Sequence, residues 1–283
     1  MSDLYDVQMC GYAILKDVTK LCDEHGLHYF LSSGTLLGAV RHKGFIPWDN
    51  DIDIEMPVED YRKFLKLAPK YLDSNLFLQT YQSDHSYNEM WAKVRRSGTT
   101  SLPLVWKNLN MHWGIGIDIF PLVGVYQNAF LAKLQKKLLS IDRAMLSKEF
   151  VLATSKDAIN HKLRLLYLLP RGTRSLLCKL FERIIFKNFK KSKQVAMVYT
   201  NFCPYIKREA YDPIEYLQFE CSTFSVPGNW DYVLKTYYGD YMTPPPESER
   251  NGHEGLLGKI IYDVNKGFQE YQQELTTDSV DKI

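Results

Sequence analysis

The spacing of apolar residues in the first 125 positions predicts helices that alternate with strands. Leu4 to His25 has apolar residues at helical intervals and is followed by Gly26, a common helix terminator. Val58 to Leu72 has the same spacing, and Leu36 to Val40 can open a short helix. Short apolar or alternating runs predict strands at residues 27–31, 51–56, 77–81, 90–94 and 115–120, the last one closed by Pro121.

The pattern changes after residue 125. Helical spacing predicts helices at residues 129–150, 161–169 and 175–189, with a break at the Pro-Arg-Gly of residues 170–172. Residues 219–253 contain glycines and prolines at intervals, so we predict mostly loop and turn there. These elements predict an α+β fold in which a mixed-sheet core at residues 1–125 carries a helical and loop-rich region at residues 126–283.

The composition is that of a globular protein with a sizeable core. Apolar residues make up 45% of the 283 positions and charged residues 24%. No apolar run approaches the ~18 residues of a membrane span, so we expect neither a span nor a signal peptide. The five cysteines are odd in number and have no CxxC spacing, which favours a reducing, cytoplasmic location over a disulfide framework or a zinc site.

The charge is unevenly distributed along the chain. Residues 156–193 contain eleven Lys or Arg and two acids, a charge of +9, so the other residues carry −7 because the whole chain carries +2. The basic part at residues 163–193 is a candidate peripheral contact with the anionic inner face of a membrane, and a polar helical cap over the rest of the fold is the alternative. Nucleic acid is disfavoured because no motif that reads it is present.

Paired acidic residues give the strongest chemical signal. Asp51 and Asp53 are two apart on a predicted strand, so their carboxylates project from one face about 6–7 Å apart. Asp118 adds a third carboxylate from a later apolar strand. Like charges this close repel unless a cation lies between them, and Mg²⁺ or Mn²⁺ prefers such oxygen ligands. Asp49 lies two residues before Asp51, so alternation places it on the same face, where it is either a further metal ligand or a residue that caps the loop.

Other residues near these acids are candidates for binding a phosphorylated donor. Ser33, Gly34 and Thr35 follow a predicted strand and open a helix, where backbone N–H groups can cradle phosphate. The cations predicted to contact phosphate are Arg41, Lys93 and Arg95, with ordinary surface solvation as the alternative. Trp48 and Trp113 lie near the acids and either form an aromatic wall for a head group or base, or pack beneath the loops.

The amino-acid sequence of these motifs resembles that of one known family. Residues 33–42 (SGTLLGAVRH) and 45–53 (FIPWDNDID), with later matches at 93–95, 116–121 and 238–253, resemble the LicD/fukutin family. The resemblance implies a nucleotidyltransferase-like fold of the polymerase-β type and adds His253 to the candidate site. It further implies transfer of phosphocholine, or of ribitol phosphate in animal members, from a CDP-linked donor to a cell-surface glycan or its lipid-linked precursor.

These observations predict a metal-dependent phosphotransferase, and they leave some alternatives open. Asp51 and Asp53 would hold Mg²⁺ against the donor diphosphate, while Asp118 is either a further ligand or the base that accepts the acceptor proton. One alternative is a nucleotidyltransferase that leaves a nucleoside monophosphate on its acceptor. The other is a non-catalytic protein that binds glycan or membrane through the basic region.

Overall fold

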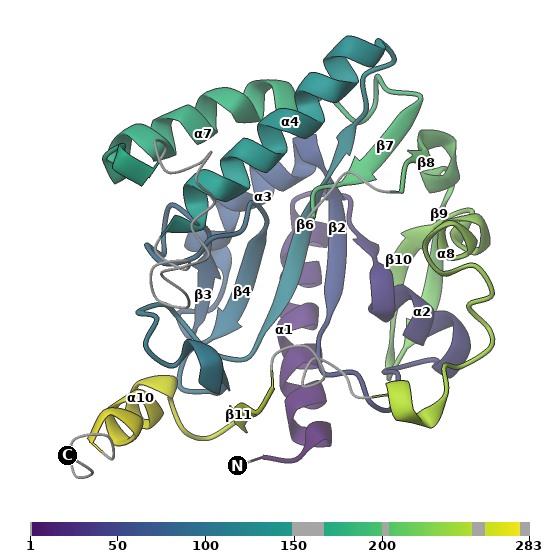
Figure 1. Ribbon diagram of the computed structural model, residues 1–283. Coiled ribbons are helices and arrows are strands. Elements are labelled where there is room, and N and C mark those ends of the chain that lie inside the picture. Colours follow the sequence, from purple (N-terminus) through teal and green to yellow (C-terminus); the bar gives the residue numbers. More distant parts are fainter. Residues whose placement is uncertain (1, 149–166, 200–203, 251–257, 278–283) are drawn as a thin grey trace.

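The computed structural model describes residues 2–148, 167–199, 204–250 and 258–277 as an α+β protein built on a mixed sheet (Figure 1). The predicted fold class is confirmed. The main path of this sheet runs in the order β1-β2-β6-β4-β3, and β7 pairs with the far end of β6 and with β8. The strands are β1 (Phe30–Leu31), β2 (Asp53–Pro57), β3 (Leu76–Gln79), β4 (Ala92–Arg96), β6 (Gly116–Gly124), β7 (Gln194–Met197) and β8 (Ile206–Lys207).

Two long amphipathic helices cover one face of the sheet. α1 (Leu4–Glu24) contacts β4 and β6, and α3 (Val58–Tyr71) contacts β2, β3 and β6. The Asp3 carboxylate caps α1 by accepting a hydrogen bond from the Asp6 backbone N–H at 2.9 Å. Both helices fall close to their predicted bounds because their apolar residues form single stripes, and Leu15 and Phe64 on these stripes are completely buried.

β2 and β6 form the parallel pair at the centre of the sheet, with Asp53 in register with Asp118. β6 continues to Gly124, so the predicted end of this strand at Pro121 was wrong. A proline removes one N–H from the strand. Here the loss is harmless, because antiparallel pairing of β6 with β4 ends at Ile119 and pairing with β7 begins at Leu122.

α4 (Ala129–Leu146) and α7 (Arg171–Ile185) pack side by side on the outside of the fold (Figure 1). Pro170 was predicted as a break, and it is the N-cap residue of α7, a position where a missing N–H costs little. The helix therefore starts four residues earlier than predicted. The predicted helix at 161–169 lies largely outside the described residues, as does the end of the one at 129–150.

The prediction of mostly loop at 219–253 was wrong for residues 222–238. β9 (Ile214–Phe219) and β10 (Ser222–Pro227) form an antiparallel hairpin, and α8 (Trp230–Tyr238) follows it. The turn residues that suggested a loop are element boundaries, since the Asn229 side chain caps α8 by accepting a hydrogen bond from Tyr232 N–H. The remaining elements are β5 (Thr100–Pro103), which pairs with β11 (Ile260–Asp263), α10 (Phe268–Thr277), and 3₁₀ turns at Leu104–Trp106, Arg208–Tyr211 and Glu247–Glu249.

The main hydrophobic core crosses the proposed boundary at residue 125. Leu36 and Ile119 from the first region pack in the same cluster as Leu139, Ile185 and Phe219 from the second. The second region is thus packed on the first, and the division into 1–125 and 126–283 stays a prediction. Within the described ranges, no helix has the length and apolar character needed to cross a bilayer.

Asp142 on α4 generates a prediction about stability. Its side chain is fully buried and faces the Cys178 thiol of α7, a weak donor. Burial, reinforced by the charge of Glu182, raises the pKa of Asp142 to about 8. When folding raises the pKa of a carboxyl, the folded protein loses stability as the pH rises from the pKa of the unfolded state, near 4, to the pKa of the folded state. Asp142→Asn removes this charge.

We therefore expect Asp142→Asn to raise the free energy of unfolding by a few kcal/mol more at pH 8.5 than at pH 4, on the order set by ~1.4 kcal/mol per pKa unit. Urea denaturation at the two pH values measures the difference. Glu215→Gln on β9 replaces an exposed acid and serves as the control. An equal gain in the free energy of unfolding at both pH values would contradict the raised pKa of Asp142.

Candidate active site

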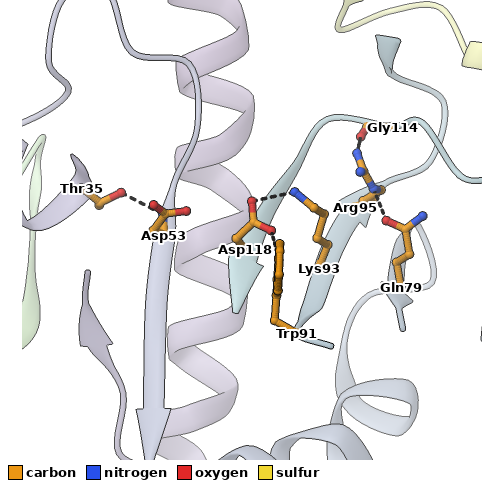
Figure 2. Close-up of polar contacts among 8 residues, drawn as sticks. All are labelled: Thr35, Asp53, Gln79, Trp91, Lys93, Arg95, Gly114 and Asp118. Carbon is orange, nitrogen blue, oxygen red and sulfur yellow. Dashed lines mark hydrogen bonds and ion pairs between the residues drawn. The ribbon is translucent and has the colours of Figure 1, made fainter. Parts of the chain in front are cut away.

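A row of polar side chains crosses three neighbouring strands at one place in the sheet. Asp53 on β2 is in register with Asp118 on β6, and Asp118 is in register with Lys93 on β4. Residues in register on adjacent strands project their side chains to the same face. Figure 2 shows Asp53, Asp118 and Lys93 turned toward one another on that face. Strand pairing alone therefore brings together residues that are 65 positions apart in the chain.

Asp51 joins this row from the loop that precedes β2. One carboxylate oxygen from each of Asp51, Asp53 and Asp118 lies within 4.8 Å of the others. The predicted strand at 51–56 begins only at Asp53, so Asp51 reaches the site from the loop. The structure thus brings all three predicted carboxylates together. Asp51 reaches them from a loop, and not through the strand alternation that was predicted for it.

Asp118 is held on both oxygens. The Trp91 indole N–H donates to Oδ1 at 2.6 Å, and the Lys93 ammonium pairs with Oδ2 at 2.7 Å (Figure 2). Asp53 is fixed through its backbone, because its N–H donates to Thr35 Oγ1 at 2.8 Å. These contacts orient two of the three carboxylates before any ligand binds. Trp91 was not among the predicted site residues, since nothing in its local sequence indicates a contact with residue 118.

The electrostatics of the site favour a bound cation. Burial first, and then the charges of Asp51, Asp118 and Asp49, raise the pKa of Asp53 well above its ordinary value, and Lys93 only partly offsets this. Burial and the Asp51 carboxylate likewise raise the pKa of Asp49 to about 8. Four acids face one lysine, so without a cation their mutual repulsion is relieved by proton uptake. An oxygen-only set of converging carboxylates fits a hard divalent ion.

The start of α2 (Ser33–His42) borders these carboxylates, and Ser33 and Gly34 line the same cavity. Ser33 adopts a left-handed backbone conformation with φ of 48°, a strained geometry that is often found at functional sites. A Cβ at Gly34 would lie 2.7 Å from Asp49 Oδ2, so a larger residue here would require the Asp49 carboxylate to move. Thr35 is buried, and its hydroxyl accepts from Asp53 N–H, so its role here is to tie α2 to β2.

The cavity above the carboxylates has a volume of about 390 Å³ and an aromatic wall. Trp91, Phe120 and Tyr199 form this wall, with ring centroids 5.1–5.8 Å apart. Tyr199 is 45% exposed, so part of its surface is open to a ligand. Sequence reasoning missed all three rings. Strand alternation gives a sequence signal for two of them, because Phe120 follows Asp118 by two residues and Trp91 precedes Lys93 by two on predicted strands.

Arg95 and Trp113 lie outside this cavity. The Arg95 guanidinium is buried, and it donates to the Gln79 side chain and to the Gly114 carbonyl (Figure 2). Trp113 is buried in a separate cluster, where it stacks on Trp106 at 6.0 Å. Of the two readings that the sequence left open for Trp113, packing is the one that its position fits. Arg95 shares a sheet face with Lys93, yet its hydrogen bonds hold it against the protein.

Arg41 and Trp48 gather at the other end of α2. Arg41 Nη1 donates to the Tyr241 carbonyl at 2.9 Å, and the Arg250 guanidinium lies 4.9 Å from the centre of the Trp48 ring. Burial first and then Arg250 lower the pKa of Arg41, which indicates that the two cations are neighbours. Neither Arg41 nor Trp48 lines the carboxylate cavity. His253 lies outside the described residues.

A larger cavity, about 550 Å³, lies between α3, β3 and α7. Its charged lining residues are Arg62 and Glu182, and Glu182 accepts a hydrogen bond from the Tyr81 hydroxyl at 2.6 Å. Trp91 borders both cavities. The smaller cavity is the better candidate for catalysis because the clustered carboxylates and Lys93 open into it, whereas the larger one has no such group of charges among the described residues.

Comparison with known proteins identifies the domain that carries these residues. Residues 26–138 match the family model described as LicD/FKTN/FKRP, nucleotidyltransferase domain. This segment contains α2, β2, β4 and β6, and with them every carboxylate of the candidate site. Residues 26–138 therefore belong to the LicD family, as their motifs predicted.

Named relatives extend the match. The lipopolysaccharide cholinephosphotransferase LicD of Haemophilus influenzae is 27% identical over 261 residues, covering 88% of this chain and 95% of that protein. The human ribitol 5-phosphate transferase FKRP is 29% identical over 97 residues, 29% of this chain and 20% of that protein. An uncharacterised protein of Rickettsia typhi is 43% identical over 60 residues, 21% of this chain and 19% of its own length.

The clustered carboxylates generate a prediction about metal binding. Without metal, Asp53→Asn should raise the melting temperature at pH 7, because it removes a carboxylate that is repelled by its neighbours. The wild type should gain several degrees when Mg²⁺ is added in large excess over its dissociation constant, since the ion binds only the folded state. The variant should lose most of that gain.

Differential scanning fluorimetry with EDTA or with a Mg²⁺ titration measures both effects, and Glu215→Gln again serves as the control for removal of an acid. A Mg²⁺-dependent shift that is equal in wild type and Asp53→Asn would show that the ion binds elsewhere.

Proposed function

We propose that this protein is a metal-dependent phosphotransferase that moves phosphocholine from a CDP-linked donor to a sugar hydroxyl of a cell-surface glycan or its lipid-linked precursor. The observation that carries the proposal is the convergence of Asp51, Asp53 and Asp118 within 4.8 Å beside Lys93. Two relatives support the transfer of a phosphate-containing group, since one is a cholinephosphotransferase and the other a ribitol 5-phosphate transferase.

In this proposal the carboxylates hold Mg²⁺ or Mn²⁺. Bound there, the ion would neutralise the charge that develops on the donor diphosphate. The acceptor hydroxyl oxygen forms a bond to the phosphorus that carries the head group, and the bond from that phosphorus to the CMP oxygen breaks. CMP leaves, and the hydroxyl proton passes to a carboxylate of the site or to water.

The chain's own residues position the reactants. The first turn of α2, at Ser33 and Gly34, offers backbone N–H groups and the positive end of a helix dipole to a phosphate. Lys93 supplies the positive charge nearest to the carboxylates. Asp118 is held by Lys93 and Trp91 in an orientation suited to a metal ligand or to a base, and both roles are compatible with these contacts.

The aromatic wall supports choline as the head group. A quaternary ammonium cannot donate hydrogen bonds, and it is attracted to the faces of aromatic rings. Trp91, Phe120 and Tyr199 present such rings next to the carboxylates, whose negative charge also favours a cationic head group. An uncharged polyol such as ribitol would gain no cation–π attraction from these ring faces.

The first test measures turnover. Asp51→Asn, Asp53→Asn and Asp118→Asn should each lower kcat/KM about 10³-fold, because each removes several kcal/mol of electrostatic stabilisation. CMP release from CDP-choline, with mass analysis of the glycan acceptor, provides the measurement. Glu215→Gln should retain full activity.

Product mass separates this proposal from nucleotidyl transfer. An acceptor that gains the small phospho-group supports it, whereas an acceptor that gains the nucleotide, with release of phosphocholine, contradicts it. Full function in the Asp51→Asn/Asp53→Asn variant would instead indicate a non-catalytic protein.

The second test concerns the head group. Tyr199→Leu should raise the KM for CDP-choline about 5–30-fold, the size of a cation–π contact, and should leave the KM for CDP-ribitol unchanged. Tyr199→Phe keeps the ring and should behave as the wild type. An equal loss with both donors would mean that Tyr199 acts on the fold or on the shared nucleotide.

A further inference from the structure

α4 and α7 form an antiparallel pair whose inner faces are fixed by buried contacts. The Gln135 side chain of α4 donates to the Ile185 carbonyl at the end of α7 at 2.8 Å. At the opposite end, Arg174 of α7 donates to the Met145 carbonyl near the end of α4. Both helices lie on the outside of the fold (Figure 1). Their buried residues fall on the inner faces, so the remaining stripes face outward.

Only cations among the charged residues lie on the outward stripes. The two helices contain two acids, and both point inward: Asp142 is fully buried, and Glu182 accepts the Tyr81 hydroxyl at the cavity wall. The exposed charged residues of the pair are Lys133, Lys136, Lys137, Lys179 and Arg183. A solvated helix face normally mixes both signs of charge. A face with five cations and no exposed acid is complementary to a polyanionic surface.

Large apolar side chains are interleaved with these cations. Leu176 is 58% exposed and Leu180 is 42% exposed, and they alternate along α7 with Lys179 and Arg183 at intervals of one helical turn. The most exposed large apolar residue on α4 is Phe130, at 73%. This arrangement is typical of helices that lie in the interface of a bilayer, where lysine and arginine reach the head groups while leucine and phenylalanine enter the acyl boundary.

We propose that the outward face of α4 and α7 is a docking surface for an anionic lipid bilayer. Charge complementarity selects the occupant: free polyanions would be bound by the cations alone, and a bilayer also accounts for the exposed Leu176, Leu180 and Phe130. The sequence indicated only the segment 163–193. The structure places α4 beside α7 and turns the acids inward, which adds a second helix to the surface and leaves only cations among its exposed charged residues.

This surface is connected to the candidate active site. Arg143 near the end of α4 lies 3.8 Å from the Glu89 carboxylate, and Trp91, two residues further on, borders the cavity. A bilayer bound to α4 and α7 therefore lies within a short chain of contacts from the catalytic residues. Docking itself does not depend on the proposed function, and its test does not require turnover.

The experiment is cosedimentation of the purified full chain with lipid vesicles. The wild type should bind vesicles of phosphatidylcholine with about one-third phosphatidylglycerol, should bind phosphatidylcholine alone much more weakly, and should be released by high salt. The triple variant Lys133→Gln/Lys137→Gln/Lys179→Gln should lower the partition coefficient roughly 100-fold, at about fivefold per cation.

The matched control is Lys20→Gln/Lys66→Gln/Lys70→Gln, which removes the same charge from exposed positions of α1 and α3. It should bind as the wild type, and circular dichroism and melting temperature check that each variant is folded. An equal loss in this control would mean that net charge alone drives binding, which would overturn the proposal.

Leu176→Gln/Leu180→Gln tests the apolar part at unchanged charge. It should lower the partition coefficient about tenfold or more, since two leucines no longer leave water. Undiminished binding would reduce the surface to a general polyanion site and overturn the proposal, as would failure of the wild type to bind any anionic vesicle. A dimer in size-exclusion chromatography that this variant converts to a monomer would assign the face to a second copy of the chain instead.

Discussion

The parallel pairing of β2 with β6 is the constraint on which the candidate site depends. It places Asp53 opposite Asp118 in the middle of a sheet, where two carboxylates would otherwise be avoided. The surrounding structure supports this costly arrangement with Lys93 and the Trp91 indole on Asp118, and with Thr35 on the backbone of residue 53. A fold that maintains such repulsion has a site suited to positive charge.

The same row of residues explains how one cavity could bind both charged ends of a donor. Carboxylates and the first turn of α2 lie at its base, and aromatic rings from three separate segments form its wall. A metal with a diphosphate needs the first set, and a cationic head group needs the second. The named cholinephosphotransferase relative, which aligns with most of this chain, fits this division of the cavity.

The region beyond residue 125 contributes to the site as well as covering it. β7 extends the sheet beside β6 and leads to Tyr199, and α8 ends at Tyr238, which also lines the cavity. α4 and α7 add an outward face of uniform charge. If a lipid-linked glycan is the acceptor, these helices would hold the enzyme where that acceptor is found.

The sequence by itself determined the elements whose signal is local. The stripes of α1 and α3, the strand at 53–56 and the carboxylates at 51, 53 and 118 were all predicted, because periodicity and charge spacing are properties of a short segment. The motifs at 33–53 also indicated the LicD family, which the match over residues 26–138 confirms.

Only the tertiary structure decided which side chains meet. Lys93 and Arg95 are equivalent by alternation, yet register places the first against Asp118 while Gln79 and Gly114 hold the second away. Trp91 and Tyr199 became part of the cavity, and Trp113 did not, for the same reason. The inward turn of Asp142 and Glu182 likewise required the packing of α4 on α7. Contacts between distant segments depend on pairing register and core packing, and neither is encoded in the spacing of nearby residues.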